Sequence, residues 1–557
     1  MSKVRFFALG GLGENGKNMY VVEVDTHMFI LDAGLKYPSA SLLGVDTLYP
    51  DMSYLEKNKD KIQGIFLSHG HEDHIGAVVE VLKRFNIGVF GTHFTISLLE
   101  NAIQEAGLNI KDYRLYRINE DKILTFGDVK VEVYNVSHGI PEAVHIAIIT
   151  NDGAIVYAPD FNFDINPNYK YHISFNKINE VAQNGVLAVC SESLGSGNIS
   201  RTTTTSSFDK FVNTAISIPQ RVIFTLFSTD LAKIQRVVNW CVKAKRKIAV
   251  IGIKSQKIIA IAMSSGYLNI PPENLVNLKF RTDKIKNEDK DLVVIVTGIR
   301  HEPFYMLQRM CRGQDRLIQI NKEDEVIMMT PPVPGTERMA ARTLDTILMT
   351  GAKGTLVNKN ALRSTHADGE DLRLLYNMLK PKYIIPIIGE YRHQYQQKEI
   401  AVDAGYDPNK VIILENGQVA TFTDGVLDNT SEKVSTGDVL VNGSIVGDIN
   451  EVVLKDRDIL SEEGIIFVTT TINRASKTII GGPIFETKGF NSDKYDSNLA
   501  DMEEKVVAYL YKNMGKKNAG LVKIKEYLRD DLSRYIYREM RKRPIIIITI
   551  IDISRDL

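Results

Sequence analysis

The feature that most constrains the fold is a change of pattern that begins near residue 206 and reverses near residue 351. Residues 1–205 alternate short β-rich runs such as "MYVVEV" and "GIFLS" with turns and few helices, which is typical of two facing sheets with loops gathered at one end. Residues 206–350 alternate strand and helix, as in "RVIFTLFST" and "DLAKIQRVVNWCVKAK", which predicts a doubly wound parallel sheet. Residues 351–425 return to the first pattern. The sequence therefore predicts one α/β domain in two parts, with a second domain inserted between them.

A third unit is predicted at the C-terminal end. Residues 426–449 contain Gly, Ser and Thr and read as a linker, and residues 450–557 contain the strand "GIIFVTTTI", two helices and the apolar strand "PIIIITIIDI". This order of elements predicts a small α/β domain. Its last strand could lie at a sheet edge, where it would invite pairing with another chain.

Composition excludes several classes of protein. The chain has 557 residues, 44% hydrophobic and 24% charged, which indicates globular domains and excludes disorder. Its 68 basic and 68 acidic residues cancel, so net charge gives no argument for a nucleic-acid partner. Without a signal-peptide core or an apolar run of the ~18 residues that span a membrane, we expect a cytoplasmic protein with no membrane association. Cys190, Cys241 and Cys311 are widely spaced and are expected to be buried free thiols.

The strongest chemical signal is "IFLSHGHEDHIGA", which places His69, His71, Asp73 and His74 within six residues after an apolar run. Imidazole nitrogens and aspartate oxygens are the ligands of catalytic zinc or manganese, and a two-metal hydrolase needs about six or seven of them, including a bridging carboxylate. A lone loop histidine is usually just solvated, but this density is hard to explain structurally. We predict a metal site that needs further ligands from elsewhere in the chain.

The spacing His-x-His-x-Asp-His resembles the signature of the metallo-β-lactamase superfamily, whose fold is an αββα sandwich. The resemblance implies that His138 in "YNVSHGIPEA" completes the first metal site, that Asp160 in "YAPDF" bridges two metals, and that Asp32 in "FILDAG" orients a motif histidine. Taken alone, Asp32 or Asp160 would more often be a turn residue at a strand end. His145 matches nothing in the pattern, and we expect it on a strand face.

The inserted domain narrows the family. An α/β insertion between the two halves of a metallo-β-lactamase unit is the mark of the β-CASP group, which acts on RNA or DNA phosphodiesters. Within that group the chain resembles the ribonuclease J family over nearly its whole length. The stretches that carry the resemblance are "GGLGENGKNMYVVE", "LDAGLKYP", "FLSHGHEDHIGA", "TPPVPGTE", "LKPKYIIPIIGEYR", "ENGQV", "VLVNGSIVGD" and "VVLKDRDILSEEGI". The resemblance implies a metallo-β-lactamase domain over 1–205 and 351–425, a β-CASP domain over 206–350, and an assembly domain over 450–557.

The resemblance also implies an activity and partners. It implies a metal-dependent ribonuclease, a 5′-to-3′ exonuclease and also an endonuclease, that acts on single-stranded RNA in rRNA processing, RNA maturation and mRNA decay. Zn²⁺ is the expected cofactor and Mn²⁺ the alternative. Asp73 would orient the attacking water, and His366 would contact the scissile phosphate. The expected assembly is a homo-dimer or tetramer, or a hetero-oligomer with a ribonuclease J paralogue, in an RNA-degrading complex.

On the substrate side the chain departs from the family pattern. The family's Ser-Gly-His phosphate cradle is "LRSTHADG" in this chain. The residues that the resemblance assigns to the cradle are Leu362, Arg363, Ser364, Thr365 and His366. The family's Ser-Gln-Gly segment, which holds the RNA 5′ monophosphate, is "TGIRHEP" in this chain. Arg300 in this segment could bind a phosphate by its charge or fill the pocket instead.

One expected ligand of the second metal is missing. In "PIIGEYR" the family has a histidine where this chain has Ile388. The family also has a glycine before the bridging aspartate, where this chain has Pro159. Because isoleucine has no lone pair to donate, we expect one tight metal site and a weakened second site. Such losses resemble the second, less active paralogue of the family.

Three hypotheses follow from these residues. The first is a ribonuclease of low intrinsic activity, which we favour. The second is a non-catalytic RNA-binding and assembly subunit that stabilises an active paralogue. The third, a small-molecule hydrolase such as a lactonase, leaves the inserted domain and the C-terminal module unexplained.

Overall fold

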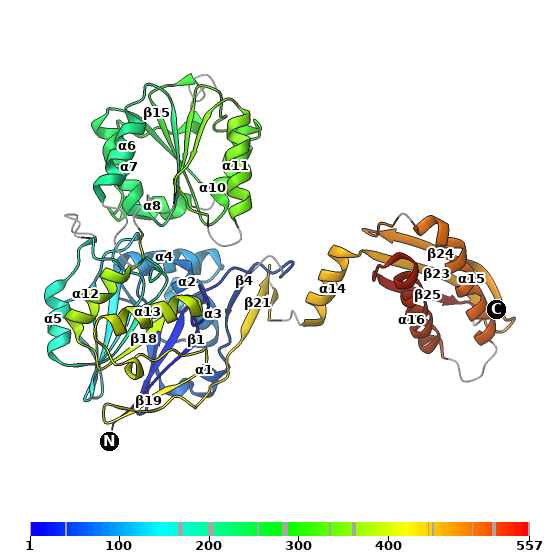
Figure 1. Ribbon diagram of the computed structural model, residues 1–557, viewed down its shortest axis with the longest axis horizontal. Helices are drawn as coiled ribbons and strands as arrows, with labels where there is room; N and C mark the ends of the chain where they lie inside the picture. The colour runs from blue at the N-terminus through cyan, green and yellow to red at the C-terminus, as the bar shows by residue number, and fades with distance from the viewer. Residues whose placement is uncertain are drawn as a thin grey trace. The chain divides into compact units, whose positions relative to one another are not determined.

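Figure 1 shows the computed structural model of the chain, coloured from blue at the N-terminus to red at the C-terminus. The residues that it describes are 2–38, 42–164, 171–198, 205–252, 255–280, 288–332, 336–358, 364–443, 445–447, 451–492, 494–514 and 520–554. The chain divides into two compact units. One consists of Met1–Tyr37 and Thr47–Val439, and the other of Pro38–Asp46 and Leu440–Leu557.

Two facing sheets form the base of the larger unit. The first has the order β20 (Val426–Asn429), β19 (Ala420–Thr423), β1 (Lys3–Gly10), β2 (Met19–Val24), β3 (His27–Leu31), β5 (Ile62–Phe66), β6 (Val89–Gly91) and β7 (Leu115–Arg117). The second has the order β18 (Tyr383–Ile387), β12 (Val186–Glu192), β11 (Gly153–Ala158), β10 (Val144–Thr150), β9 (Val129–Asn135) and β8 (Leu124–Phe126). Strands from after the insertion, β18, β19 and β20, complete both sheets.

Helices cover the outer faces of the two sheets, so the layers form an αββα sandwich (Figure 1). The helices against the second sheet are α5 (Phe175–Gln183), α12 (Gly369–Leu379) and α13 (Tyr391–Asp403), and α4 (His93–Glu105) lies against β6 and β7. Every residue of β11 and β12 is buried, because one face packs on the opposite sheet and the other under these helices. The predicted fold class is confirmed.

The strand β20 extends the first sheet into the stretch that the sequence predicts as a linker. Its pairing with β19 is antiparallel, and the two strands meet at Asp424 and Gly425, both with positive φ. An Asp-Gly pair between two apolar runs is a strong hairpin signal. The sandwich therefore continues to Asn429 in this hairpin.

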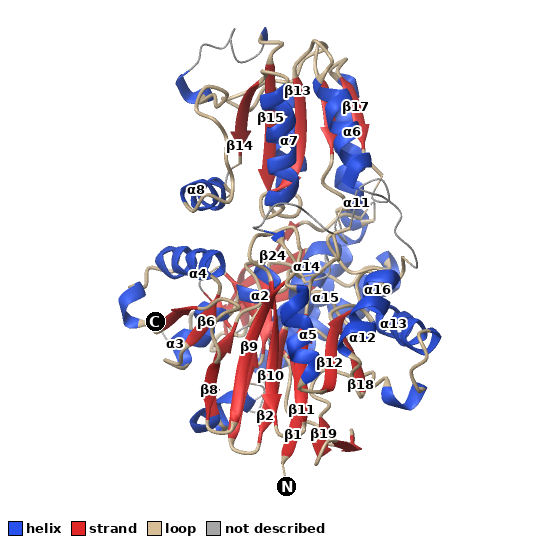
Figure 2. Ribbon diagram, turned by 90° about the vertical axis from the view of Figure 1, so that its left-hand side faces the viewer, coloured by secondary structure: helices blue, strands red, loops and turns tan. Residues whose placement is uncertain are grey.

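The inserted domain is a five-stranded sheet in which all strands are parallel. Its order is β14 (Lys247–Ile251), β15 (Leu292–Gly298), β13 (Val222–Phe227), β16 (Glu325–Met328) and β17 (Lys353–Leu356). Helices α6 (Thr205–Ile216) and α7 (Leu231–Lys243) lie on one side of it, and α10 (Glu302–Cys311) and α11 (Glu337–Met349) on the other (Figures 1 and 2). This is the doubly wound arrangement that the strand and helix alternation predicts. The predicted boundary at residue 350 is too early, because β17 pairs with β16 in this sheet and not with the sandwich.

The second compact unit has its own core. Its sheet has the order β24 (Thr478–Lys488), β23 (Ile465–Asn473) and β25 (Ile545–Asp552), and its main helices are α14 (Glu451–Glu462), α15 (Tyr495–Met514) and α16 (Leu521–Met540). Buried residues of α15 and α16 pack on alternate residues of β23 and β25. The terminal strand β25 is at the end of the strand order, and it leaves Ile547 and Ile551 exposed.

Two features bear on the class of protein. Cys190 and Cys241 are buried and Cys311 is half-buried, and all three are free thiols. Among the described residues, no helix combines the length and the apolar character that a membrane crossing requires.

Candidate metal centre

The histidine motif lies in the loop after β5 and in the short helix α2 (Glu72–Ile75). The segment after β3 holds this loop by its main chain: Ala33 N donates to His74 O at 2.8 Å. Gly34 approaches so closely that a Cβ atom there would stand 1.6 Å from the carbonyl oxygen of Asp73. The "LDAGLKYP" segment therefore fixes the backbone from which the motif side chains project.

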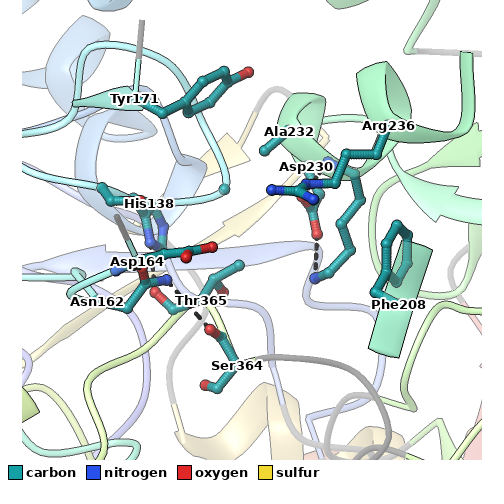
Figure 3. Close-up of a pocket in the computed structure, with 13 residues that line it drawn as sticks. His138, Asn162, Asp164, Tyr171, Phe208, Asp230, Ala232, Arg236, Ser364 and Thr365 are labelled. Atoms are coloured by element: carbon teal, nitrogen blue, oxygen red, sulfur yellow. Dashed lines mark hydrogen bonds and ion pairs between the residues drawn. The ribbon is translucent and has the colours of Figure 1, made fainter. Parts of the chain in front are cut away.

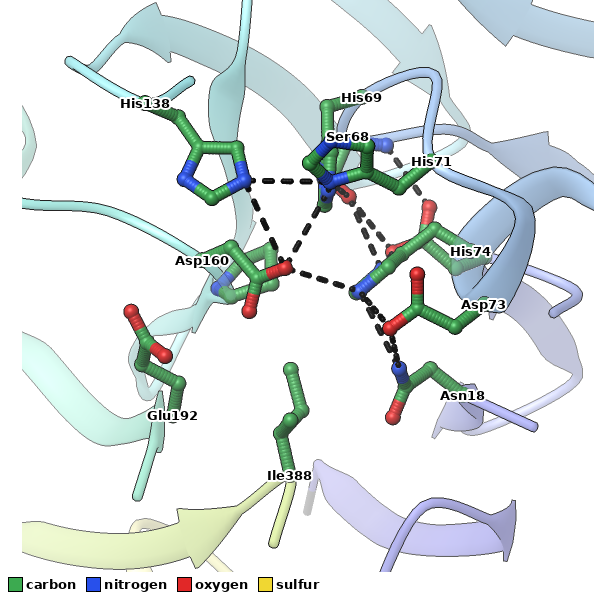
Figure 4. Close-up of polar contacts among 12 residues, drawn as sticks. Asn18, Ser68, His69, His71, Asp73, His74, His138, Asp160, Glu192 and Ile388 are labelled. Carbon is green, nitrogen blue, oxygen red and sulfur yellow. Dashed lines mark hydrogen bonds and ion pairs between the residues drawn. The ribbon is translucent and has the colours of Figure 1, made fainter. Parts of the chain in front are cut away.

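Three imidazoles and one carboxylate converge at the end of the sandwich (Figure 4). The ligand atoms of His69, His71, His138 and Asp160 all lie within 4.8 Å of one another. His71 Nδ1 is 2.9 Å from His69 Nε2 and 3.2 Å from His138 Nε2, and Asp160 Oδ2 is 3.3 Å from His69 Nε2. Ligands around a tetrahedral zinc stand roughly 3.3 to 3.4 Å apart, given bonds of about 2.0 to 2.1 Å.

Electrostatics at this group also fit a cation. Burial, together with the neighbouring imidazoles, holds the pKa of His71 well below its usual value, and burial does the same to His138. These imidazoles are therefore neutral, with lone pairs that face one another. A divalent cation suits such a set, because each nitrogen can coordinate it with its lone pair.

A second group shares a ligand with the first. Asp73, His74 and Asp160 lie within 4.8 Å by their ligand atoms, and Asp160 Oδ2 is 3.4 Å from His74 Nε2. Burial raises the pKa of Asp160, but the charge of His366 and hydrogen bonds from the surrounding histidines outweigh it and hold this pKa well below its usual value. Asp160 is thus an ionised carboxylate between two groups of donors.

Asp32 lies fully buried beneath the motif and receives four hydrogen bonds. Its Oδ2 accepts from His74 Nδ1 and Ser68 Oγ, both at 2.6 Å, and from Tyr157 OH at 2.7 Å, and its Oδ1 accepts from Ser68 N at 2.8 Å. This contact places the proton of His74 on Nδ1 and leaves Nε2 to face Asp160. Ser68 and Tyr157 are partners that the motif spacing did not predict.

A buried glutamate, also not predicted, holds the histidine of the substrate cradle. Glu192 is fully buried; its Oε1 accepts from Phe161 N at 2.8 Å and Ala367 N at 3.0 Å, and its Oε2 is 2.8 Å from His366 Nδ1. Although burial lowers the pKa of His366, the charges of Glu192 and Asp160 raise it well above its usual value. His366 is therefore an imidazolium that points one nitrogen at these carboxylates.

The position of Glu192 follows from strand order. Strands β11, β12 and β18 are parallel neighbours, and Asp160, Glu192 and Ile388 stand at or just after their carboxyl ends. The signal in the sequence is an acidic residue at the end of the apolar run "GVLAVCSE". Ligands in open α/β sheets gather at such ends.

Ile388 occupies the position of the missing histidine. It is fully buried with φ +50°, and its backbone is held by Ile388 N donating to Gly11 O at 3.1 Å and Ser193 Oγ donating to Ile388 O at 2.7 Å. Figure 4 shows its side chain directed toward the space beside Asp160. A hydrocarbon side chain therefore faces the centre from the residue that follows β18.

Asn18 is a further residue that sequence reasoning missed. Its Nδ2 is 3.1 Å from His74 Nε2 and 3.4 Å from Asp73 Oδ2 (Figure 4). An amide N–H thus lies against the lone pairs of two residues of the second group. The sequence carried a weak signal for it, because Asn18 lies in the glycine-rich segment "GGLGENGKN".

The substrate cradle is only partly described. Leu362 and Arg363 lie outside the described residues. Thr365 acts through its main chain, since its carbonyl oxygen is 2.8 Å from His138 Nδ1. Ser364 Oγ accepts a hydrogen bond at 3.0 Å from the main-chain N–H two residues later. The cradle therefore orients His138 and His366, which it brings to the metal centre.

Two other predicted residues lie outside the ligand groups. The guanidinium of Arg300 stacks over the ring of Tyr37 at 4.3 Å, and Tyr37 OH donates to Glu72 at 2.5 Å. His145 is buried on β10, 3.2 Å from Tyr134 OH and 3.3 Å from the carbonyl oxygen of Pro159. His145 thus lies on a strand face, as expected, and supports the turn that carries the bridging aspartate.

A cavity of about 60 Å³ opens beside His138 (Figure 3). Its lining includes Asn162, Asp164 and Tyr171 from the sandwich, Ser364 and Thr365 from the cradle, and Phe208, Asp230, Lys233 and Arg236 from the inserted domain. The two basic side chains have acidic partners: Lys233 is 2.6 Å from Asp230 and Arg236 is 3.1 Å from Asp209.

Comparison with known proteins places these features in a family. Four family models match successive parts of the chain: the metallo-beta-lactamase superfamily (residues 12–156), the ribonuclease J beta-CASP domain (219–347), the Zn-dependent metallo-hydrolase RNA specificity domain (357–413) and the ribonuclease J C-terminal domain (452–553). Ribonuclease J 2 of Staphylococcus aureus is 33% identical over 554 residues, which cover 99% of this chain and 98% of that protein. Ribonuclease J2 of Bacillus subtilis is 33% identical over 552 residues, 99% of each chain. Carrying the sandwich, the insertion and the converging ligands together, the chain belongs to the ribonuclease J family of metal-dependent nucleases.

Proposed function

We propose that this chain hydrolyses phosphodiester bonds of single-stranded RNA, as a 5′-to-3′ exonuclease and as an endonuclease, with low intrinsic activity. The observation that carries the proposal is the convergence of His69, His71, His138 and Asp160, with Asp160 shared by a second group of donors. Its family relatives are named ribonucleases. In such a family this site is where a phosphodiester would be cleaved.

The donor set favours Zn²⁺ in the first group. Three imidazoles and one carboxylate suit zinc, whereas manganese prefers sites richer in oxygen. A bound divalent cation supplies Lewis-acid chemistry, since it lowers the pKa of water and offsets charge on a phosphoryl oxygen. Mn²⁺ is the alternative where a site is richer in carboxylates.

Residues of the chain would supply the remaining steps. Asp73 is half-buried at the rim of the centre, so its carboxylate can accept a hydrogen bond from the attacking water and orient it. His366 uses Nδ1 to contact Glu192, which leaves Nε2 to donate to a phosphate oxygen. The raised pKa of His366 supports this role, because a protonated imidazole stabilises charge as it develops on the phosphate.

The cavity beside His138 supports RNA as the substrate. It combines two cations, Lys233 and Arg236, with the aromatic rings of Tyr171 and Phe208, and single-stranded nucleic acids bind through phosphate contacts and base stacking. Both cations are already ion-paired, so RNA has to displace an internal carboxylate to reach them. We expect modest affinity for this reason.

The proposal also includes low intrinsic activity and assembly with other chains. Ile388 withholds a ligand from the second group, which lowers the number of donors for a second ion. The exposed apolar residues of the C-terminal sheet, among them Ile484, Ile547 and Ile551, support assembly as a homo-oligomer or with a ribonuclease J paralogue. The activity would then serve rRNA processing, RNA maturation and mRNA decay within an RNA-degrading complex.

A second candidate is a non-catalytic RNA-binding and assembly subunit. The observation that favours it is the pair of Ile388 and Asn18, which place a hydrocarbon chain and an amide N–H beside the second group. In that case an active paralogue would perform the cleavage. The cavity and the C-terminal unit would then be the functional parts of this chain.

The test is release of labelled nucleotide from a 5′-monophosphorylated single-stranded RNA, with chain free of any paralogue and with added Zn²⁺ or Mn²⁺. We expect slow cleavage that His69→Ala abolishes and Ile388→His raises. If all three proteins are equally silent while RNA is still bound, the chain is a binding subunit and the catalytic proposal fails.

A further inference from the structure

Asp160 has one carboxylate oxygen that lacks a hydrogen-bond partner. Its Oδ2 lies among the imidazoles, 3.3 Å from His69 Nε2 and 3.4 Å from His74 Nε2. Its Oδ1 accepts no hydrogen bond, although the residue is only 3% exposed. A buried carboxylate oxygen is costly without a positive neighbour, and the positive charge that faces Oδ1 is the imidazolium of His366, 3.3 Å away. A cation in place of the proton on His366 Nδ1 would satisfy the same oxygen.

Two further ligand atoms lie on that side. His366 Nδ1 is 3.3 Å from Asp160 Oδ1 and 2.8 Å from Glu192 Oε2, and one ligand atom from each of the three residues lies within 4.8 Å of the others. Because the other oxygen of Glu192 is taken by two main-chain N–H groups, Oε2 is fixed toward this point. Ligands joined to a cation by bonds of about 2.0 to 2.2 Å stand roughly 2.9 to 3.6 Å apart, so the two distances to His366 Nδ1 are close to those of a partial coordination shell.

The opposite side of Asp160 is less suited to a second ion. There Asn18 Nδ2 lies 3.1 Å from His74 Nε2 and 3.4 Å from Asp73 Oδ2, so an amide N–H already satisfies lone pairs that a cation would need. Ile388 adds a buried hydrocarbon chain in place of a ligand. Asp160 Oδ1 therefore faces Glu192 and His366, whereas the amide of Asn18 stands against Asp73 and His74 on the other side.

We propose that the second divalent cation of this chain binds at Asp160 Oδ1, Glu192 Oε2 and His366 Nδ1 instead of at Asp73 and His74. The inference rests on the proposed metal-dependent function and says where its second ion lies. Two carboxylates and one imidazole suit Mn²⁺. Asp160 would offer one oxygen to each ion. The cation would replace the proton on His366 Nδ1, which passes to solvent, and His366 would keep its Nε2–H for phosphate.

The experiment counts ions in the absence of RNA. The full chain is stripped with a chelator and dialysed against Mn²⁺, and bound manganese per chain is measured by atomic emission. Glu192→Gln and Asp73→Asn form a matched pair, because each replaces one carboxylate by an amide. We expect two ions in the unmodified chain, two in Asp73→Asn and one in Glu192→Gln.

A reversal control uses Ile388→His, which restores a nitrogen on the Asp73 side. In that background Asp73→Asn is expected to lose an ion and Glu192→Gln to keep it. Glu192→Gln retains Oε1 as an acceptor for its two N–H donors, and thermal melting of the metal-free variants checks folding. Should it still fail to fold, His366→Ala, at a half-exposed residue, removes the same site and is expected to bind one ion.

Two results would overturn the inference. One is a single ion in the unmodified chain. The other is loss of the second ion in Asp73→Asn together with its retention in Glu192→Gln. Because no RNA is cleaved in this experiment, either result leaves the proposed nuclease activity standing, and a silent nuclease assay leaves the ion count unaffected.

Discussion

At the scale of single residues, the centre depends on partners that never touch a metal. Asp32 Oδ2 accepts hydrogen bonds from His74 Nδ1 and Ser68 Oγ, and Tyr157 OH donates to the same oxygen from the facing sheet. These contacts fix the side-chain rotamers of the residues that hold the motif histidines in place. The ligand motif is therefore effective only because a buried charge lies beneath it.

Asp32→Asn is expected to weaken zinc binding about tenfold to a hundredfold, as losses of such supporting contacts do. The amide cannot accept all four hydrogen bonds, so Ser68, whose Oγ lies 3.0 Å from Nδ1 of the zinc ligand His69, loses its fixed position. Competition with a zinc-binding dye measures the affinity. Tyr157→Phe is the control, because it removes one of the four bonds and should cost less. Equal affinity in Asp32→Asn and the unmodified chain would refute this role.

His145 makes stability depend on pH. Burial lowers its pKa from 6.5 to about 3, so between these values the unfolded chain takes up a proton that the folded chain does not. Stability due to this residue is therefore complete above pH 6.5 and falls as pH drops toward 3, by at most about 1.4 kcal/mol per pH unit. His145→Gln keeps a donor for Pro159 and should reduce the difference in unfolding free energy between pH 7 and pH 5. Urea unfolding of the metal-free chain at the two pH values measures this difference. The same pH dependence of stability in the variant and the unmodified chain would contradict this role of His145.

At the scale of elements, the prediction from sequence succeeded where one segment holds its own signal. The doubly wound insertion was visible because strand and helix alternate along the chain, and the motif histidines lie together in one loop. Glu192 and Asn18 were missed because their roles depend on contacts with residues that are distant in sequence. Glu192 pairs with Ile387 across two parallel strands, and no local pattern states which strands are adjacent.

Contact between the segment after β3 and the motif loop gives an element-scale prediction. A Cβ at Gly34 would overlap the carbonyl oxygen of Asp73, so Gly34→Ala must push the motif loop away. We expect a loss of stability of about 1 to 3 kcal/mol or more, together with weaker zinc binding. Gly437→Ala is the control, since the nearest atom there is 3.9 Å away. Chemical denaturation and metal titration of both variants check this, and an unperturbed Gly34→Ala would contradict it.

At the scale of the whole molecule, the charges balance, so any attraction for RNA has to be local. The chain has 68 basic and 68 acidic residues. Two of the basic residues, Lys233 and Arg236, line the cavity beside His138, and each has a carboxylate partner. The sequence could not reveal this, because the basic residues lie on the inserted domain and the histidine lies on the sandwich. Only the folded chain brings them to one cavity.

This arrangement predicts how RNA binding responds to salt. For a single strand, removing one side chain that neutralises a phosphate lowers the slope of log affinity against log salt by about 0.7. Arg236→Gln is therefore expected to weaken binding of a single-stranded RNA and to reduce the slope by about that amount, while the ion content stays unchanged. Arg529→Gln, on the C-terminal unit and paired only with Asp530 among the ion pairs of the described residues, is the matched control. Fluorescence anisotropy over a salt series measures both slopes. If the two variants behave alike, RNA does not reach the cavity, and the path of the strand past His138 has to be placed elsewhere.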